Sequence, residues 1–397
     1  MLRFHPLRVS VVRPEADEAV CLTLDVPPEL RDTFRAQAGQ HVVVRAQVGG
    51  EEQRRTYSLL SAAGELPLRI AVRTHAHGQV SGFIAKNVRA GDTLDVMPPN
   101  GSFGPRASVG GTYVAFAAGC GITPIISMIR TLLAQNATSR VLLFYGNRNY
   151  ARGMLFEELL ALKDRYLNRF ALHFIMSGEP QEIALLNGRL DASKVSELAG
   201  EFFDAASVRD YFVCGPGTMI EAVSGALRAL GVEAPRIHSE HFAVMSEAEA
   251  TQAASSEPGA AKVVADGAQN ALPSQGAPKS SGQTARDTAA NRSDAAAEGV
   301  ADANVTQVEL IMDGRRRSFT MRTREDTILD AAERAGIDLP FSCKAGVCST
   351  CRTKLVRGKV ELAQNYALED WELEQGFILA CQAHAQTPEL ELNYDET

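Results

Sequence analysis

The four cysteines near the C-terminus constrain the fold of this chain more than any other feature. Cys343, Cys348 and Cys351 lie in one nine-residue segment, and Cys381 follows thirty positions later. This C-x4-C-x2-C…C spacing is typical of a [2Fe–2S] cluster. Two irons and two sulfides form a compact rhomb that needs four thiolates, three from a tight loop and one from a distant strand. Gly346, inside the loop, lets backbone N–H groups approach the sulfides.

A zinc site and idle thiols are the alternatives for these cysteines. Zinc ligands usually come as two C-x2-C pairs, and this chain has only one such pair. The other three cysteines, Cys21, Cys120 and Cys214, are widely scattered, and we expect them to be buried in or near strands. Because the total of seven is odd, a disulfide framework is not indicated. The pattern therefore favours the iron–sulfur cluster.

Composition divides the chain after residue 245. Residues 246–304 contain no aromatic residue and no Ile, and Leu272 is their only Leu. Such a segment cannot bury enough apolar surface to offset its ordering entropy, so we expect a flexible, disordered linker. A poorly packed helical layer is the alternative, because Ala is a good helix former. The predicted folded parts are residues 1–108, 109–245 and 305–397.

The two predicted N-terminal domains differ in the length and spacing of their apolar runs. Up to about residue 106 the runs are short and punctuated by turns, and residues 68–72 alternate with period two, which indicates an antiparallel β-barrel or sandwich. After Gly111, strands alternate with helices, which predicts a doubly wound α/β domain with a parallel sheet. The fold class is therefore multi-domain.

Arg55-Thr56-Tyr57-Ser58 is the strongest motif of the first domain. Arg55 can pair bidentately with a diphosphate. Tyr57 offers a flat face that can stack on a flavin ring. Ser58 can form a hydrogen bond with flavin N5, the atom that accepts hydride. These residue types predict a flavin site, and an exposed strand edge is the alternative.

A glycine-rich turn follows the first expected strand of the α/β domain. Its residues are Gly119-Cys120-Gly121-Ile122-Thr123-Pro124. Such a turn before a helix allows close backbone approach to a dinucleotide, with its phosphates at the helix N-terminus. Proline in place of the third glycine is tolerated at the first helical position, where we expect Pro124. The context predicts NAD(P) binding, and a tight turn without a ligand is the alternative.

These motifs together resemble a known family. Residues 305–397 resemble plant-type ferredoxin domains, and Arg55-Thr56-Tyr57-Ser58 resembles the R-x-Y-S flavin motif of ferredoxin–NADP reductase-like proteins. The order, reductase first and ferredoxin last, resembles the reductase subunits of phenylacetyl-CoA epoxidases, and related oxygenase reductases share it. The resemblance implies FAD rather than FMN and a β-grasp-like α+β ferredoxin domain. It covers the whole chain except the linker, which is longer than expected in that family.

The resemblance also assigns further residues. Gly78-Gln79-Val80-Ser81 resembles the family's G-x-x-S motif, which cradles the diphosphate at a helix start. Cys214-Gly215-Pro216 matches its C-G-P motif, which faces the nicotinamide. Phe242 would cover the flavin where the nicotinamide must later sit. Val72 and Arg73 would border the flavin, with Arg73 standing where the family often has Lys. Ser58, Cys214 and Phe242 are thus the expected catalytic residues.

Arg148 bears on the choice of nicotinamide. It ends the second expected strand of the α/β domain, where NAD-preferring sites tend to place an acid for the ribose hydroxyls. No acid follows before Glu157, so the sequence favours NADPH over NADH. A surface charge is the alternative for Arg148. His238 and His241 are expected to be surface residues rather than catalytic ones.

Charge narrows the expected partners and location. The formal net charge is −8, with no long basic block, so neither nucleic acid nor a membrane surface is expected as a partner. The N-terminal residues lack the apolar core of a signal peptide, so we expect a cytoplasmic protein. The ferredoxin segment carries an acidic run that is expected to form one solvated face, and the alternative hypothesis is that it steers a basic oxygenase surface: Glu361, Glu369, Asp370, Glu372 and Glu374.

The sequence therefore predicts an electron-transfer reductase. Electrons would pass from NAD(P)H to FAD, then to the [2Fe–2S] cluster and on to an oxygenase component. By the resemblance, that component is the di-iron phenylacetyl-CoA epoxidase of phenylacetate degradation. A reductase of another ring-hydroxylating or steroid-hydroxylating oxygenase is the nearest alternative. A redox carrier or sensor module without an oxygenase partner is the alternative of another class.

Overall fold

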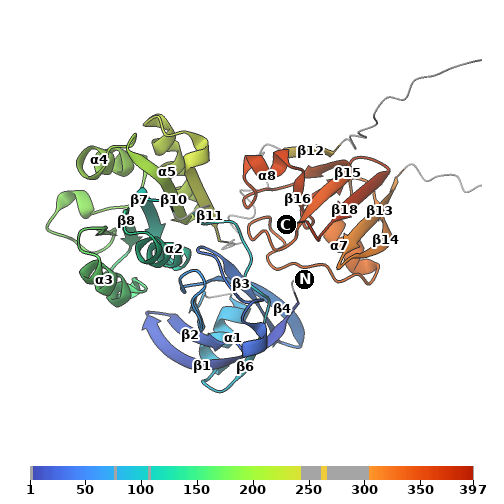
Figure 1. The fold of residues 1–397 in the computed structure, drawn as a ribbon, viewed down its shortest axis with the longest axis horizontal. Helices are drawn as coiled ribbons and strands as arrows, with labels where there is room; N and C mark the ends of the chain where they lie inside the picture. Colours follow the sequence, from blue (N-terminus) through green and yellow to red (C-terminus); the bar gives the residue numbers. More distant parts are fainter. Residues whose placement is uncertain (1–2, 76–77, 106–108, 243–260, 266–303, 397) are drawn as a thin grey trace, which may run out of the picture.

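The computed structural model describes residues 3–75, 78–105, 109–242, 261–265 and 304–396. Their strands form three separate sheets, one for each folded part that the sequence predicts (Figure 1). The three parts lie around a common centre, where β11 and the ferredoxin loops approach the first domain. The multi-domain prediction is confirmed.

The first domain is a six-stranded antiparallel sheet with one helix. The strand order is β4-β3-β6-β1-β2-β5. A bridge between Leu59, directly after β4, and Ile70 of β5 joins the two end strands, as the predicted barrel requires. The elements are β1 (His5–Ala16), β2 (Ala19–Asp25), β3 (His41–Val48), β4 (Glu51–Ser58), β5 (Leu68–Arg73), α1 (Gln79–Asn87) and β6 (Thr93–Val96).

The second domain is a five-stranded parallel sheet in the order β11-β10-β7-β8-β9. The chain starts in the middle strand, β7, builds outward to one side and then crosses to the other, which is the doubly wound topology predicted. The elements are β7 (Gly111–Ala118), α2 (Ile122–Gln135), β8 (Ser139–Asn147), α3 (Phe156–Arg165), β9 (Phe170–Met176), α4 (Ala192–Phe202), β10 (Val208–Gly215), α5 (Gly217–Ala229) and β11 (Ile237–His241).

Helix α2 joins the first two domains. Its apolar residues, among them Ile122, Ile126 and Ile129, are buried in one core with Cys21 and Leu60 of the first domain. Because α2 packs against the sheet and against the neighbouring domain, it needs few charged residues. Within the described residues, no helix is long and apolar enough to cross a membrane.

The third domain has the mixed sheet of a ferredoxin. Parallel pairing of β13 with β18 places the two ends of this segment side by side, and α7 packs beneath the sheet core. The elements are β13 (Val305–Met312), β14 (Arg315–Arg322), α7 (Ile328–Arg334), β15 (Arg352–Leu362), α8 (Asp370–Glu374), β16 (Phe377–Leu379), β17 (Ala383–Ala385) and β18 (Glu389–Asn393).

One strand of this sheet comes from the predicted linker. β12 (Ala261–Ala265) pairs antiparallel with residues 358–362 of β15, in a register that joins Val263 to Val360. Figure 1 shows β12 along the edge of the ferredoxin sheet. The composition of residues 246–304 gave no reason to expect this strand. Residues 246–260 and 266–303 lie outside the described residues.

The glycine-rich turn differs from expectation in one detail. Residues Gly119–Gly121 form a single 3-10 turn, and α2 begins at Ile122. Pro124 is therefore the third helical residue, not the first. The position tolerates proline because the first four N–H groups of a helix have no partner within it.

Candidate functional site

A cavity of about 580 Å³ lies where the first domain, the second domain and the ferredoxin domain meet. The first domain provides most of its wall, from β4, β5 and the start of α1. The ferredoxin domain closes one side with its cysteine loop. The sequence-predicted residues that line it are Arg55, Thr56, Tyr57, Ser58, Arg73, Gly78, Val80, Ser81, Thr123 and Phe242, together with Cys343 and Cys348.

Ser58 and Tyr57 form the interior of this cavity. The Ser58 side chain is buried, and its Oγ has no hydrogen-bond partner among the described residues. A buried hydroxyl without a partner is costly, so this Oγ is suited to a polar atom of a bound molecule. Burial raises the pKa of Tyr57 well above its usual range, so its ring remains neutral beside the cavity.

The phosphate-binding features lie at the outer end. The Arg55 guanidinium has no acidic partner among the described residues, although it donates to the Arg54 carbonyl oxygen at 2.7 Å. Helix α1 starts after Gly78 without a side-chain cap, so its first N–H groups are free to bind an anion. A Cβ on Gly78 would lie 2.3 Å from Ser81 Oγ, so a larger residue there would displace the Ser81 side chain.

Glycine is required in the turn before α2, because the neighbouring atoms there belong to the backbone. A Cβ on Gly121 would lie 2.1 Å from the carbonyl oxygen of Cys214. The contact brings the turn against the end of β10, so the two nicotinamide motifs meet. Tyr145 braces the same turn, because its hydroxyl donates to the Gly119 carbonyl oxygen at 2.9 Å. Sequence reasoning missed Tyr145, which carries no motif.

Cys214 is a buried neutral thiol. Burial raises its pKa well above the usual range, and the nearby Glu240 and Cys120 add to this effect. A thiol in this state is not a nucleophile, which agrees with the positioning role expected for it. Cys214 pairs with Glu240 across β10 and β11. Glu240 is itself largely buried, and burial raises the pKa of its carboxyl.

The cysteine loop supplies a four-thiol site. The neighbouring thiols of Cys348 and Cys381 lower the pKa of Cys343, and the Ala345 amide donates to Cys343 Sγ at 3.3 Å. Cys381 also lies within hydrogen-bond reach of Cys351. In the described part of the chain, no three His, Cys, Asp or Glu side chains are arranged so that they could hold a single metal ion. Four neighbouring thiols suit a cluster whose two irons share them.

Polar and aromatic contacts hold the ferredoxin domain on the first domain. Thr56 Oγ1 and Ser342 Oγ are hydrogen-bonded at 2.9 Å, directly beside Cys343. Arg54 Nη2 contacts Asp338 Oδ1 at 3.4 Å, and its guanidinium lies 4.1 Å from the centre of the Phe341 ring. The flavin motif and the cysteine loop are thus in direct contact.

His238 holds the ferredoxin domain on the second domain. Its Nδ1 lies 3.1 Å from Glu369 Oε1, and its Nε2 lies 3.2 Å from Asp210 Oδ1. Burial lowers the pKa of His238, but the two carboxylates outweigh this effect and raise it to about 9. The expectation that His238 is a surface residue is wrong, because its side chain is buried at a domain interface.

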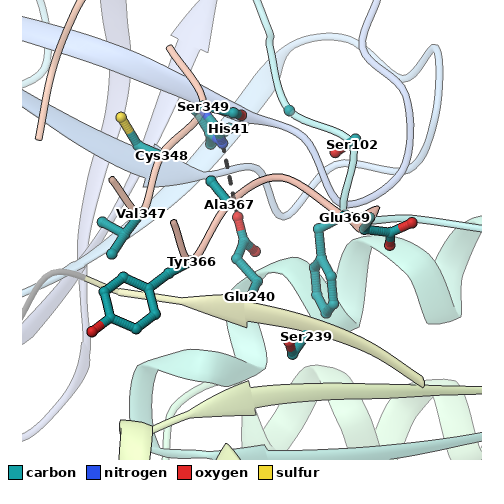
Figure 2. A pocket seen from close by; sticks show the side chains of 12 residues that line it. His41, Ser102, Ser239, Glu240, Val347, Cys348, Ser349, Tyr366, Ala367 and Glu369 are labelled. Carbon is teal, nitrogen blue, oxygen red and sulfur yellow. Dashed lines mark ion pairs between the residues drawn. The ribbon is translucent and has the colours of Figure 1, made fainter. Parts of the chain in front are cut away.

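A smaller cavity adjoins the cluster loop (Figure 2). It is lined by all three domains, with His41 from the first, Glu240 from the second, and Cys348 and Tyr366 from the third. His41 Nδ1 and Glu240 Oε1 form an ion pair at 3.8 Å, drawn as the dashed line in Figure 2. No sequence motif marked His41 or Glu240, because their roles depend on contacts between domains.

Several predicted residues lie beside the main cavity rather than in its wall. Val72 is fully buried in the barrel core. Arg148 is exposed directly after β8, and none of the acids in the described chain forms an ion pair with it. The remaining predicted residues, those of the glycine-rich turn and the C-G-P segment, meet at the carboxyl ends of β7 and β10: Gly119, Gly121, Pro124, Cys214, Gly215 and Pro216.

Three family descriptions match successive parts of the chain. Residues 13–104 match the oxidoreductase FAD-binding domain, and residues 116–225 match the oxidoreductase NAD-binding domain. Residues 310–386 match the 2Fe-2S iron-sulfur cluster binding domain. The protein is therefore an oxidoreductase whose cofactors are FAD, a [2Fe–2S] cluster and NAD(P)H. The unpartnered Ser58 Oγ, the open start of α1 and the four converging thiols fit these groups.

Relatives match over almost the whole length of the chain. The chain is 35% identical to a subunit of the 1,2-phenylacetyl-CoA epoxidase of Escherichia coli (strain K12), over 100% of this chain and 99% of the relative. It is 30% identical to the ferredoxin reductase component of 3-ketosteroid-9-alpha-monooxygenase from Rhodococcus rhodochrous, over 98% and 96%. Phthalate dioxygenase reductase shares the fold, with 21% identity, a TM-score of 0.53 and 98% coverage of both chains. This chain belongs to the family of oxygenase reductase components that join FAD-binding, NAD-binding and 2Fe-2S domains.

Proposed function

We propose that this protein is the reductase of a phenylacetyl-CoA epoxidase. The observation that carries the proposal is the common cavity of the flavin motif and the cysteine loop, which Tyr57, Ser58, Cys343 and Cys348 all line. The similarity to the Escherichia coli epoxidase subunit supports the choice of acceptor. When bound, FAD accepts two electrons from NAD(P)H and releases them singly to the cluster.

The residues of this chain bind and position the groups for that transfer. Arg55 and the start of α1, at Gly78 and Ser81, hold the diphosphate. Tyr57 would stack on the flavin ring, and Ser58 would bind its polar edge. Phe242, from the end of the second domain, also lines the cavity. Because the Thr56–Ser342 hydrogen bond holds the cysteine loop against this wall, electrons have a short path between the domains.

We further propose that NADPH is the preferred electron donor. Gly119, Gly121, Thr123 and Pro124 would hold its diphosphate, with the C-G-P segment at the nicotinamide. Arg148 is exposed at the carboxyl end of β8 without an ion-pair partner among the described acids, so its charge is available. An arginine at this position suits a 2′-phosphate. We also propose a cytoplasmic location, since thiolate ligands need a reducing compartment.

Coupled turnover tests the proposed acceptor. The purified holoprotein is mixed with NADPH and either a phenylacetyl-CoA epoxidase or a ketosteroid 9α-monooxygenase, and product is measured against NADPH consumed. We expect tight coupling with the epoxidase alone. Tight coupling only with the steroid enzyme would overturn the proposed acceptor. Slow NADPH oxidation with ferricyanide as acceptor would contradict the reductase function itself.

A further inference from the structure

Arg54 is a buried cation that the proposed function does not use. It precedes the flavin motif on β4, and only 9% of its surface is exposed. A buried charge is costly unless it is paired. Glu52, of the same strand, accepts a hydrogen bond from Arg54 Nε at 2.8 Å. Two further partners come from the ferredoxin domain: Asp338, whose Oδ1 lies 3.4 Å from Nη2, and Phe341, whose ring centre lies 4.1 Å from the guanidinium.

Strand β4 brings Arg54 to the segment that leads into the cysteine loop. Side chains two positions apart on a strand project from the same face, so Arg54 and Thr56 share one side of β4. Arg54 lies against the Phe341 ring, and Thr56 Oγ1 is hydrogen-bonded to Ser342 Oγ at 2.9 Å. Phe341 and Ser342 directly precede Cys343. Two neighbouring contacts therefore fix this end of the loop against the strand that carries the flavin motif.

The apolar core of the ferredoxin domain is separate from the rest of the protein. Among the described residues, that core contains only residues between 308 and 394, whereas the core around α2 joins the first two domains. A shared apolar core resists separation of two domains, because separation would expose it to water. The position of the ferredoxin domain depends instead on contacts such as those of Arg54 and His238. His238 belongs to the second domain, whereas Arg54 belongs to the strand of the flavin motif.

We propose that Arg54 is a positioning residue for electron transfer from the flavin to the cluster, because its contacts with Asp338 and Phe341 hold the cysteine loop against the flavin motif. In each transfer one electron leaves the reduced flavin and enters the oxidised cluster, and two transfers return the flavin to its oxidised form and release one proton to water. Arg54 itself gains and loses nothing. Among the described residues, the lining of the flavin cavity includes Arg55 and Thr56 but not Arg54, so its removal should leave flavin reduction by NADPH intact. The inference rests on the proposed function.

Loss of the guanidinium should slow electron transfer from flavin to cluster about tenfold. Arg54→Gln removes one ion pair and one cation–π contact, whose combined effect is about tenfold in the docking equilibrium. Stopped-flow absorbance after anaerobic mixing with NADPH separates the two half-reactions in the full-length holoprotein. We expect flavin reduction at the wild-type rate and cluster reduction about tenfold slower. Equal slowing of both half-reactions, as a merely structural role would give, or an unchanged rate of cluster reduction would overturn the inference.

Arg45→Gln is the matched control. Arg45 lies opposite Arg54 on β3, and it likewise pairs with Glu52 and lies over the Phe4 ring. Its other ion pair, with Asp95, is also within the first domain. We therefore expect wild-type rates for both half-reactions in Arg45→Gln. If cluster reduction slowed as much as in Arg54→Gln, the effect would come from the positive charge of this strand pair, and the role of the ferredoxin contacts would be refuted.

A second measurement does not depend on electron transfer. Hydrogen–deuterium exchange in the oxidised holoprotein, read by mass spectrometry on peptides that cover residues 338–343, reports how often this segment separates from β4. We expect faster exchange in Arg54→Gln than in the wild type and in Arg45→Gln, and equal exchange in all three would contradict the inference. Slow NADPH oxidation with ferricyanide by the wild-type chain would refute the proposed function, whereas a wild-type rate of cluster reduction in Arg54→Gln would refute the role of Arg54 alone.

Discussion

The docking of the ferredoxin domain should weaken as pH rises, because His238 bridges two carboxylates. Its pKa is raised to about 9, from an ordinary 6.5. The stabilisation is therefore complete below about pH 6.5 and is lost as the pH passes 9. Above that pH the neutral ring has one N–H, so it can donate to Asp210 or to Glu369 but not to both.

The size of this effect can be worked out from the structure. A net shift from 6.5 to about 9 corresponds to about 3 kcal/mol, at roughly 1.36 kcal/mol per pKa unit, after the opposing effect of burial is subtracted from that of the two carboxylates. Asp210 belongs to the same domain as His238, so only the share of Glu369 depends on docking. The Glu369 side chain is 37% exposed, and solvent screening reduces that share to about 1 kcal/mol. The equilibrium constant for docking of the ferredoxin domain should therefore fall about fivefold as the pH passes 9.

Stopped-flow kinetics can test this prediction. NADPH is mixed anaerobically with the holoprotein between pH 6 and 10, and electron transfer from flavin to cluster is followed by absorbance. We expect the wild-type rate to fall towards pH 10 and Glu369→Gln to be slower and nearly independent of pH. Glutamine keeps an oxygen acceptor for the Trp371 indole, which now donates to Glu369 at 2.6 Å.

Glu374→Gln is the matched control, because Glu374 is an exposed acid of the same helix, α8. Its pH profile should equal that of the wild type. The interpretation of His238 as an interdomain bridge would be refuted by a Glu369→Gln profile that still falls with pH like the wild-type profile.

Four further substitutions test the site. Gly121→Ala should slow flavin reduction by NADPH at least about tenfold with FAD retained, because the added Cβ would collide with the Cys214 carbonyl oxygen. Gly225→Ala is its control and should change the rate little, because a Cβ there has no neighbour within 4 Å. Ser58→Ala should slow the same half-reaction about tenfold in stopped-flow traces, the usual effect of one lost hydrogen bond. Arg148→Ala should lower kcat/KM for NADPH about tenfold to a hundredfold and leave the value for NADH unchanged, and equal losses would contradict the 2′-phosphate assignment. Cys381→Ser should abolish the cluster absorbance but retain NADPH–ferricyanide activity, and an intact cluster would exclude Cys381 as a ligand.

Local motifs could be predicted from the sequence, because their chemistry depends on neighbouring residues in the chain. The cysteine loop, the residues from Arg55 to Ser58 and the turn at Gly121 each combine spacing with a strand or helix boundary. In the second domain the motifs meet because the carboxyl ends of parallel strands lie at one sheet edge. Contacts between domains could not be predicted in this way. Arg54, one residue before the flavin motif, contacts Asp338 and Phe341, which are far away in sequence.

The acidic run of the ferredoxin segment shows the same limitation. Glu372 is buried, with an oxygen 2.9 Å from Arg352 Nε, and Glu369 faces His238. The acids therefore do not form the single solvated face that their sequence suggests. Composition counts charged residues but does not show which side of a short helix each one occupies.

The ferredoxin sheet includes a strand, β12, that lies outside residues 305–397 of the sequence. An unpaired strand edge is a template for other chains, and β12 covers residues 358–362 of β15 on that side. A fragment that begins at Val305 would expose those backbone groups, whereas one that begins before Ala261 would keep them paired. Designers of a free-standing electron carrier from this protein should therefore retain Ala261–Ala265 as part of its folding unit.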